Sequence, residues 1–135
     1  MRLSNAQLKA LDERLFDYPY VMSNIAHRKL ELQTTIEHDE NIGGGKGNRV
    51  SKPTERIIAL WSDDARIKSL ETFEKAVRAT LAELDSELKT IFELRWSKGS
   101  RNTWEEIADK LHISRMGIYR KRKRILSIFA EKSGM

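Results

Sequence analysis

The stretch that decides the fold is TWEEIADKLHISRMGIYRKRKR, residues 103–124. Thr103 precedes Glu106 by three positions, which is the spacing of a capping box, so a helix is expected to begin there. This helix is expected to end near His112, and Ser114 can cap a second helix only two or three residues later. Two helices joined by so short a turn are typical of a helix-turn-helix. The stretch therefore predicts a motif of the kind that binds DNA.

The apolar residues of the motif predict its interior. The small side chain of Ala108 lets the two helices approach closely where they cross, and Ile118 is expected to hold the second helix against the first. Leu111 and Ile113 are expected to fill the corner. Trp104, in the first turn, either braces the motif or lies near the DNA backbone. This arrangement leaves the N-terminal half of the second helix protruding, which is how a helix-turn-helix enters a major groove.

Charge is distributed unevenly along the 135 residues and is concentrated in the same motif. The net charge is +5, and residues 84–135 account for all of it, with twelve Lys and Arg against seven Asp and Glu. Residues 95–124 carry ten basic and three acidic side chains and end in the run RKRKR at 120–124. A basic half joined to a neutral half suggests that one end of the chain meets a polyanion. The run supplies attraction to DNA of any sequence.

Upstream of the motif the sequence also predicts helices and shows no convincing period-two strand pattern. A first helix is expected from about Ser4, and the YPY segment at 18–20 ends it. A second helix is expected to reach about Ile36. It is followed by the polar, glycine-rich stretch EHDENIGGGKGNRVSKP, residues 37–53, which predicts an ordered loop or linker.

A long apolar stripe follows this linker. A short helix is expected to open near Thr54, and Asp63 or Asp64 is expected to start the next one. From there apolar residues recur every three or four positions, which is a strong amphipathic signal, and Asp85 offers a cap that would divide the stretch into two helices. Such a stripe could pack inside the chain or against a second chain. Its members are Ile67, Leu70, Phe73, Val77, Leu81, Leu84, Leu88 and Ile91.

The predicted fold is all-α, with a helical N-terminal region and a C-terminal helix-turn-helix. No uninterrupted apolar run approaches the ~20 residues that a membrane helix needs, and the N-terminus has no apolar core of signal-peptide length. The chain also lacks cysteine, which fits a reducing compartment. We expect an N-terminal helical region at 1–36, a glycine-rich linker at 37–53, a helical connector or oligomerisation region at 54–83 and the helix-turn-helix domain at 84–135.

Other residue patterns do not favour a catalytic, nucleotide-binding or metal site. The stretch GGGKGN at 43–48 lacks the preceding strand and the Gly-Lys-Ser/Thr ending of a phosphate-binding loop, although Lys46, Arg49 and Lys52 could touch backbone phosphates. The three histidines are widely spaced and have no cysteine partners, so no zinc pattern forms. Paired carboxylates stand at helix starts, where they favour the helix dipole. We expect no catalysis, no metal and no cofactor.

Two resemblances bear on these residues. Residues 84–126 resemble the fourth region of sigma factors, the module that reads promoter −35 elements, from the leading helix LDSELKTIFELRW through the Trp-Ser-Lys-Gly turn to the second helix. The whole chain is similar to the RinA/ArpU family of phage transcriptional regulators, which activate late or packaging genes in phages of Gram-positive bacteria. The segments that carry this second resemblance are LDERLFDYP (11–19), NIGGG (41–45), SKPTERIIAL (51–60), the helix-turn-helix and ILSIFAEKSG (125–134).

The family resemblance implies an all-helical protein that binds phage DNA and raises transcription by host RNA polymerase. Met116 departs from sigma-like helices, which usually carry a polar or charged residue there, and this puts the target sequence in doubt rather than the binding. Backbone N–H groups at the two helix starts can meet phosphates. The implied base-reading residues are Arg115, Met116, Tyr119 and Arg120, with Lys123 one turn further on the same face. The predicted phosphate contacts are Arg101, Thr103, Ser114, Lys121, Arg122 and Arg124.

We therefore expect a sequence-specific, DNA-binding transcriptional activator in the cytoplasm of a bacterial host, with double-stranded DNA as its partner and RNA polymerase or a sigma factor as a further candidate. One such module reads only a few base pairs, so we expect a homo-oligomer, formed through the apolar stripe at 67–91 or the N-terminal helices. Two alternatives stay open. One is a DNA-binding, small terminase-like packaging protein, in which the DNA module usually comes first in the chain. The other is a sigma-like adaptor that binds polymerase without DNA, for which the basic excess has no use.

Overall fold

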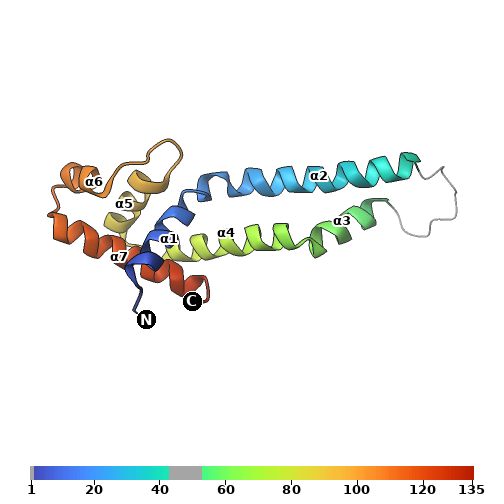
Figure 1. Cartoon of the computed structure of the whole chain (residues 1–135). Helices are drawn as coiled ribbons and strands as arrows, with labels where there is room; N and C mark the ends of the chain where they lie inside the picture. The colour runs from blue at the N-terminus through green and yellow to red at the C-terminus, as the bar shows by residue number, and fades with distance from the viewer. Residues whose placement is uncertain (1, 43–52) are drawn as a thin grey trace. The chain divides into compact units, whose positions relative to one another are not determined.

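A computed structural model describes residues 2–42 and 53–135 of the chain (Figure 1). Within these residues every regular element is a helix, which confirms the predicted all-α fold. No helix in the described part of the chain is long and apolar enough to cross a membrane. The elements are α1 (Asn5–Leu15), the 3-10 helix η1 (Tyr18–Tyr20), α2 (Val21–Ile42), α3 (Pro53–Asp63), α4 (Ala65–Glu83), α5 (Ser86–Trp96), α6 (Trp104–Leu111) and α7 (Arg115–Lys132).

The second helix is longer than predicted. α2 continues past Ile36 to Ile42, so the first six residues of the predicted linker are helical. Five of these six residues are polar, and none is glycine or proline. Gln33 donates to Glu37 across one turn at 3.1 Å. A polar stretch without a breaker can therefore extend an exposed helix. The remainder of the glycine-rich segment, at 43–52 with Lys46, lies outside the described residues, as do the possible phosphate contacts Arg49 and Lys52.

The chain divides into two compact units. One consists of Met1–Tyr20 together with Phe73–Met135, and the other is Val21–Thr72. The predicted boundary at residue 84 coincides with the break between α4 and α5, but the unit that holds the helix-turn-helix also includes α1 and the second half of α4. We call it the helix-turn-helix unit, after the motif that it contains.

The apolar stripe of α4 and α5 packs inside the chain. Helix α4 ends at Glu83, and the Asp85 carboxylate accepts a hydrogen bond from the Leu88 N–H at 2.8 Å, which confirms the predicted break. Of the eight stripe residues, six are buried and only Leu70 and Leu81 are half-buried. The stripe therefore has its partners within one chain and is not a free surface for a second copy.

Aromatic rings join the helices of the helix-turn-helix unit. The ring of Phe73 in α4 meets the edges of Tyr18 and Phe129, with centroid distances of 6.4 and 6.0 Å. Tyr18 in turn lies 6.2 Å from Phe92 of α5 in the same T-shaped arrangement. Such edge-to-face pairs each add about 0.5–1.5 kcal/mol to area burial. They link α4, α5 and α7 around one core.

The second unit contains the hairpin formed by α2, α3 and the start of α4, in which α2 and α3 lie side by side (Figure 1). Arg28 of α2 donates two hydrogen bonds to the Asp64 carboxylate, at 3.1 and 2.8 Å. These bonds from the guanidinium lower the pKa of the Asp64 carboxyl. Asp64 also caps α4, since its carboxylate accepts from the Ile67 N–H at 3.0 Å. The Trp61 indole donates to the Lys29 carbonyl at 3.1 Å. One predicted cap residue therefore holds the helices of this unit together.

Candidate nucleic-acid interface

The helix-turn-helix begins and ends where the sequence predicts. Thr103 and Glu106 form a reciprocal capping box with both hydrogen bonds at 3.1 Å, and these contacts with Thr103 lower the pKa of the Glu106 carboxyl. Helix α6 closes at His112, which takes the left-handed conformation at φ 56°, and the Ile113 N–H returns to the Ala108 carbonyl at 2.9 Å. This left-handed residue turns the chain sharply into α7.

A glycine in the first turn of α7 allows this close approach. The Ser114 hydroxyl caps α7 by accepting from the Gly117 N–H at 3.0 Å. A Cβ on Gly117 would lie 2.9 Å from the Ser114 Oγ and 3.0 Å from the Ile113 Cγ2. The first contact is closer than real Cβ atoms show and the second is tighter than nearly all of them, so a side chain at position 117 would displace the Ser114 cap or the Ile113 side chain. Sequence reasoning assigned no role to this residue.

The interior of the motif is mostly as predicted. Ala108 and Ile118 are buried, whereas the corner residues Leu111 and Ile113 are only half-buried. Trp104 is 5% exposed and its ring meets that of Trp96 edge to face at 5.5 Å. Of the two alternatives for Trp104, the structure therefore supports bracing of the motif.

A buried carboxylate in α1 anchors the motif from the other end of the chain. Asp12 accepts hydrogen bonds from the Trp96 indole (3.1 Å to Oδ1), the Arg95 Nε (3.1 Å), the Trp104 indole (2.9 Å) and the Arg122 Nε (3.2 Å). These donors come from α5, α6 and α7. Four helices thus converge on one side chain that is only 4% exposed.

Sequence reasoning missed Asp12, although a signal exists. Leu8, Asp12 and Leu15 are spaced by four and three residues, so they share one face of α1, and both leucines are buried. A carboxylate on a buried face needs charged or hydrogen-bonding partners. The sequence identifies that need without identifying the partners, which lie 83 to 110 residues away.

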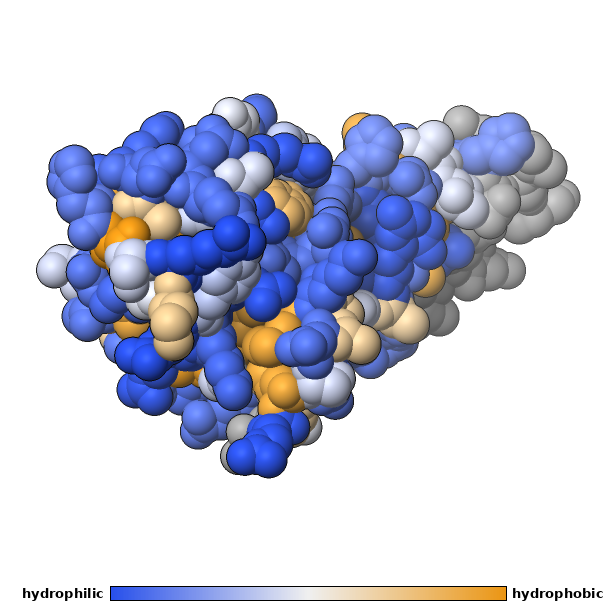
Figure 2. Space-filling view, turned by 60° about the vertical axis from the view of Figure 1, so that its left-hand side comes forward, coloured by the Kyte–Doolittle hydropathy of each residue, from blue (hydrophilic) through white to orange (hydrophobic). Residues whose placement is uncertain are grey.

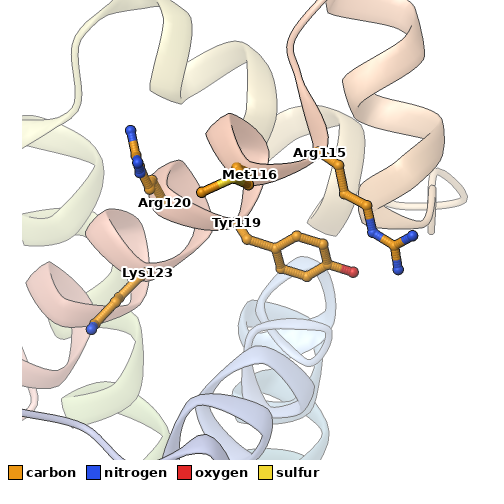
Figure 3. A pocket seen from close by; sticks show the side chains of 5 residues that line it. All are labelled: Arg115, Met116, Tyr119, Arg120 and Lys123. Atoms are coloured by element: carbon orange, nitrogen blue, oxygen red, sulfur yellow. The ribbon is translucent and has the colours of Figure 1, made fainter.

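The exposed face of α7 gathers the five predicted base-reading residues. They line one open hollow of about 440 Å³. Figure 3 shows the Arg115 guanidinium and the Tyr119 hydroxyl on one side of this face, Arg120 and Lys123 on the other, and Met116 between them. Met116 is 69% exposed. An exposed methionine flanked by three cations suits apolar contact with a base within reach of phosphates.

A carboxylate of α6 connects two of these residues. The Tyr119 hydroxyl donates to Glu105 Oε1 at 2.7 Å, and an Arg115 nitrogen lies 3.7 Å from the same oxygen. The hydrogen bond and the neighbouring cation lower the pKa of the Glu105 carboxyl, and the same bond raises the pKa of the Tyr119 phenol. Glu105 of α6 therefore positions the Tyr119 and Arg115 side chains on the exposed face of α7.

The predicted phosphate contacts separate into two groups, and one of them, Arg122, needs correction. Arg122 is bound to Asp12 and its side chain is only 18% exposed, so it belongs to the interior of the unit, contrary to our prediction. Lys121 pairs with Glu87 of α5. The Lys121 pair is exposed, so it does not contradict a phosphate contact, and this contact stays a prediction.

The remaining predicted contacts lie at the surface. Arg101 is exposed, and its guanidinium carbon lies 4.8 Å from the centre of the Phe16 ring. Arg124 is also exposed, and no ion pair forms on it among residues 2–42 and 53–135. The hydroxyl oxygens of Thr103 and Ser114 accept the helix-capping hydrogen bonds, so their hydroxyl protons and the helix-start N–H groups are the donors left to meet a phosphate.

The surface around the motif is polar. Figure 2 brings forward the side of the molecule where α6 and α7 lie, and hydrophilic side chains dominate it, with smaller apolar areas between them. The described residues contain no group of His, Asp or Glu side chains that could hold a metal ion.

Comparison with known proteins places the chain in one family. No curated protein and no solved structure is significantly similar to it. Residues 8–131, which include α7 almost entirely, match a family described as "Protein of unknown function (DUF722)". Since the match extends over most of the 135 residues, the chain belongs to this family.

Proposed function

We propose that this protein binds double-stranded DNA through its helix-turn-helix and recognises sequence with the exposed face of α7. The observation that carries the proposal is the hollow formed by Arg115, Met116, Tyr119, Arg120 and Lys123. These side chains combine positively charged hydrogen-bond donors, an aromatic hydroxyl and an apolar methionine, which are the kinds of group that contact base edges in a major groove.

The opposite face of α7 supports the proposal. Arg122 and Lys121 are tied to Asp12 and Glu87, and Ile118 is fully buried. One side of the helix is therefore packed against the rest of the unit while the other side is exposed. A reading helix needs this combination, because side chains on a fixed backbone lose less entropy on binding.

The biological role that we propose is regulation of transcription. It rests on the resemblance of the chain to phage activators of late or packaging genes, which act with host RNA polymerase. Because one motif covers only a few base pairs, the active species is proposed to be an oligomer. With the apolar stripe at 67–91 packed inside the chain, the surfaces of the N-terminal helices are the candidate interface.

The test is a competition titration on duplex fragments that tile the genome carrying this gene, with the salt concentration varied. A single fragment upstream of a transcription unit is expected to exceed random duplex by a factor on the order of a thousand. Weak, uniform and salt-sensitive binding would contradict sequence recognition. A ring of many subunits that binds a packaging site would favour the packaging alternative, and binding to polymerase without DNA would favour the adaptor.

Two arginine variants sharpen this test. Arg120→Ala is expected to lose discrimination between the preferred and random duplexes, whereas Arg124→Ala is expected to weaken binding to both and reduce the salt slope by about one. Arg66→Ala is the matched control, because Arg66 is an exposed arginine of the other unit. Equal losses on both duplexes for Arg120→Ala and Arg124→Ala would refute the assignment of Arg120 to base reading.

A further inference from the structure

We propose that Glu105 determines which bases α7 selects, by holding the Tyr119 hydroxyl as a hydrogen-bond acceptor for the amino group of adenine or cytosine. This inference rests on the proposed function. It adds a specificity-determining residue on α6, outside the reading helix.

The geometry links two helices across the motif. Glu105 lies in the first turn of α6 and Tyr119 in the second turn of α7, and their side chains meet at 2.7 Å. Tyr119 is 36% exposed and lines the hollow on the reading face. Its hydroxyl therefore has one neighbour inside the protein and an open side toward a ligand.

The direction of this hydrogen bond follows from the charges around it. Arg115 lies 3.7 Å from the same carboxylate oxygen, and the pKa of the Glu105 carboxyl is lowered, so the group is ionised near neutral pH. An ionised carboxylate only accepts hydrogen bonds. Tyr119 must then be the donor, and its single hydroxyl proton is used.

The open side of the Tyr119 oxygen then offers only lone pairs. In the major groove adenine presents the N6 amino group and cytosine the N4 amino group as donors, whereas guanine O6 and N7 and thymine O4 are acceptors. An oxygen that can only accept favours the two amino groups and repels the acceptors. A tyrosine with a freely rotating hydroxyl would tolerate either kind of base edge. Glu105 thus converts a permissive side chain into a selective one.

The test uses the duplex that binds the wild-type protein best, with each base pair replaced in turn. At the position read by Tyr119 the preferred base is expected to be adenine or cytosine. Replacing it with purine or pyrimidin-2-one analogues that lack the amino group is expected to weaken binding about fivefold, the value of one hydrogen bond. Tyr119→Phe is expected to reduce this effect to less than about twofold. Glu105→Ala frees the hydroxyl proton, so this variant is expected to bind duplexes with guanine or thymine at that position within about twofold of the preferred one. The double variant is expected to behave like Tyr119→Phe.

A matched control separates this role from charge. Asp109→Ala removes one negative charge from an exposed position of the same helix without touching Tyr119. Both acidic variants are expected to bind random duplex slightly more tightly, about twofold at low salt, because a charge that repels phosphates is gone. Only Glu105→Ala is expected to lose the amino-group preference.

The outcomes are distinguishable. If the wild-type protein prefers no duplex, the proposed function fails and the role of Glu105 fails with it. If the wild type discriminates but Glu105→Ala or Tyr119→Phe keeps the amino-group preference, only the inference about Glu105 is overturned. A uniform loss of binding to all duplexes in Glu105→Ala, with normal behaviour of Tyr119→Phe, would also overturn it, since it would indicate a purely structural role.

Discussion

Replacement of Asp12 by asparagine should destabilise the helix-turn-helix unit much more than the same isosteric change at Asp17. The substitution keeps the shape of the side chain, but it removes the charge that faces Arg95 and Arg122. It also replaces one acceptor oxygen by an amide that donates. The Trp96 indole keeps its hydrogen bond to the Asp12 backbone carbonyl at 2.9 Å, but the Trp104 indole and the two arginines then have only one side-chain oxygen left to accept from them.

The magnitude follows from the burial of the cluster. Removing one partner of a buried ion pair costs about 3–5 kcal/mol. The Arg95 and Arg122 side chains are 15% and 18% exposed, so water can partly replace the lost contact, and asparagine keeps one acceptor. We therefore expect a loss of about 2–4 kcal/mol in the free energy of unfolding. Asp17→Asn is the control, because Asp17 is 61% exposed in its pair with Arg14, and such pairs contribute about 1 kcal/mol or less.

Urea denaturation followed by tryptophan fluorescence is the appropriate assay, since Trp96 and Trp104 both contact Asp12. With a slope of about 1.5 kcal/mol per molar urea, Asp12→Asn should lower the midpoint by about 2 M, and Asp17→Asn by well under 1 M. Equal midpoints for the two variants would refute the view that Asp12 anchors the four helices.

Three further predictions concern local contacts. Gly117→Ala is expected to lower the free energy of unfolding by about 1–2 kcal/mol, because overpacking at the Ser114 cap outweighs the gain in helix propensity. Thermal unfolding measures this loss, and an unchanged or higher Tm would contradict it. Because folding lowers the pKa of Glu105, its contribution is present above the ordinary glutamate pKa and disappears as the pH falls through the lowered one. The difference in urea midpoint between wild type and Glu105→Ala should therefore vanish in acid, and a difference that persists in acid would refute this. The Tyr119 phenol should also titrate at lower pH in the variant than in the wild type, as measured by ultraviolet absorbance. Asp64→Ala should speed amide hydrogen exchange in the first turn of α4 and in α3, since the cap and the Arg28 contact are both lost; unchanged exchange would show that these contacts do not stabilise the hairpin.

The helix-turn-helix could be predicted from the sequence because its signals are local. Thr103 with Glu106, and Ser114 with the following turn, satisfy helix N–H groups through residues three positions away. The break at Asp85 is predictable for the same reason. Contacts of this range are encoded in short spacings that can be read directly from the chain.

The parts that sequence reasoning did not predict depend on distant partners. Arg122 belongs to a basic run and looks like a DNA contact until Asp12 is found beside it, 110 residues away in the sequence. Lys121 pairs with Glu87 in the same way. Helical spacing separates Lys121 and Arg122 from the face around Met116 and Lys123, but which carboxylates they meet is decided by packing between distant segments.

The extra length of α2 has a different cause. The segment after Ile36 is polar, which suggested a loop, but polarity does not end a helix that is exposed on that side. The predicted end was set by composition, whereas the helix in the structure continues through Ile42.

Photo-crosslinking tests most directly the central claim that the exposed face of α7 lies against DNA bases. Met116→benzoylphenylalanine places the probe at the most exposed apolar position of the hollow, and Ile58→benzoylphenylalanine places it at a comparably exposed position on α3 of the other unit. The account predicts crosslinks from position 116 to bases of the preferred duplex, lost on adding excess unlabelled duplex, and none from position 58. A variant at 116 that still binds DNA but forms no crosslink to bases, or forms no more than the variant at 58, would contradict it.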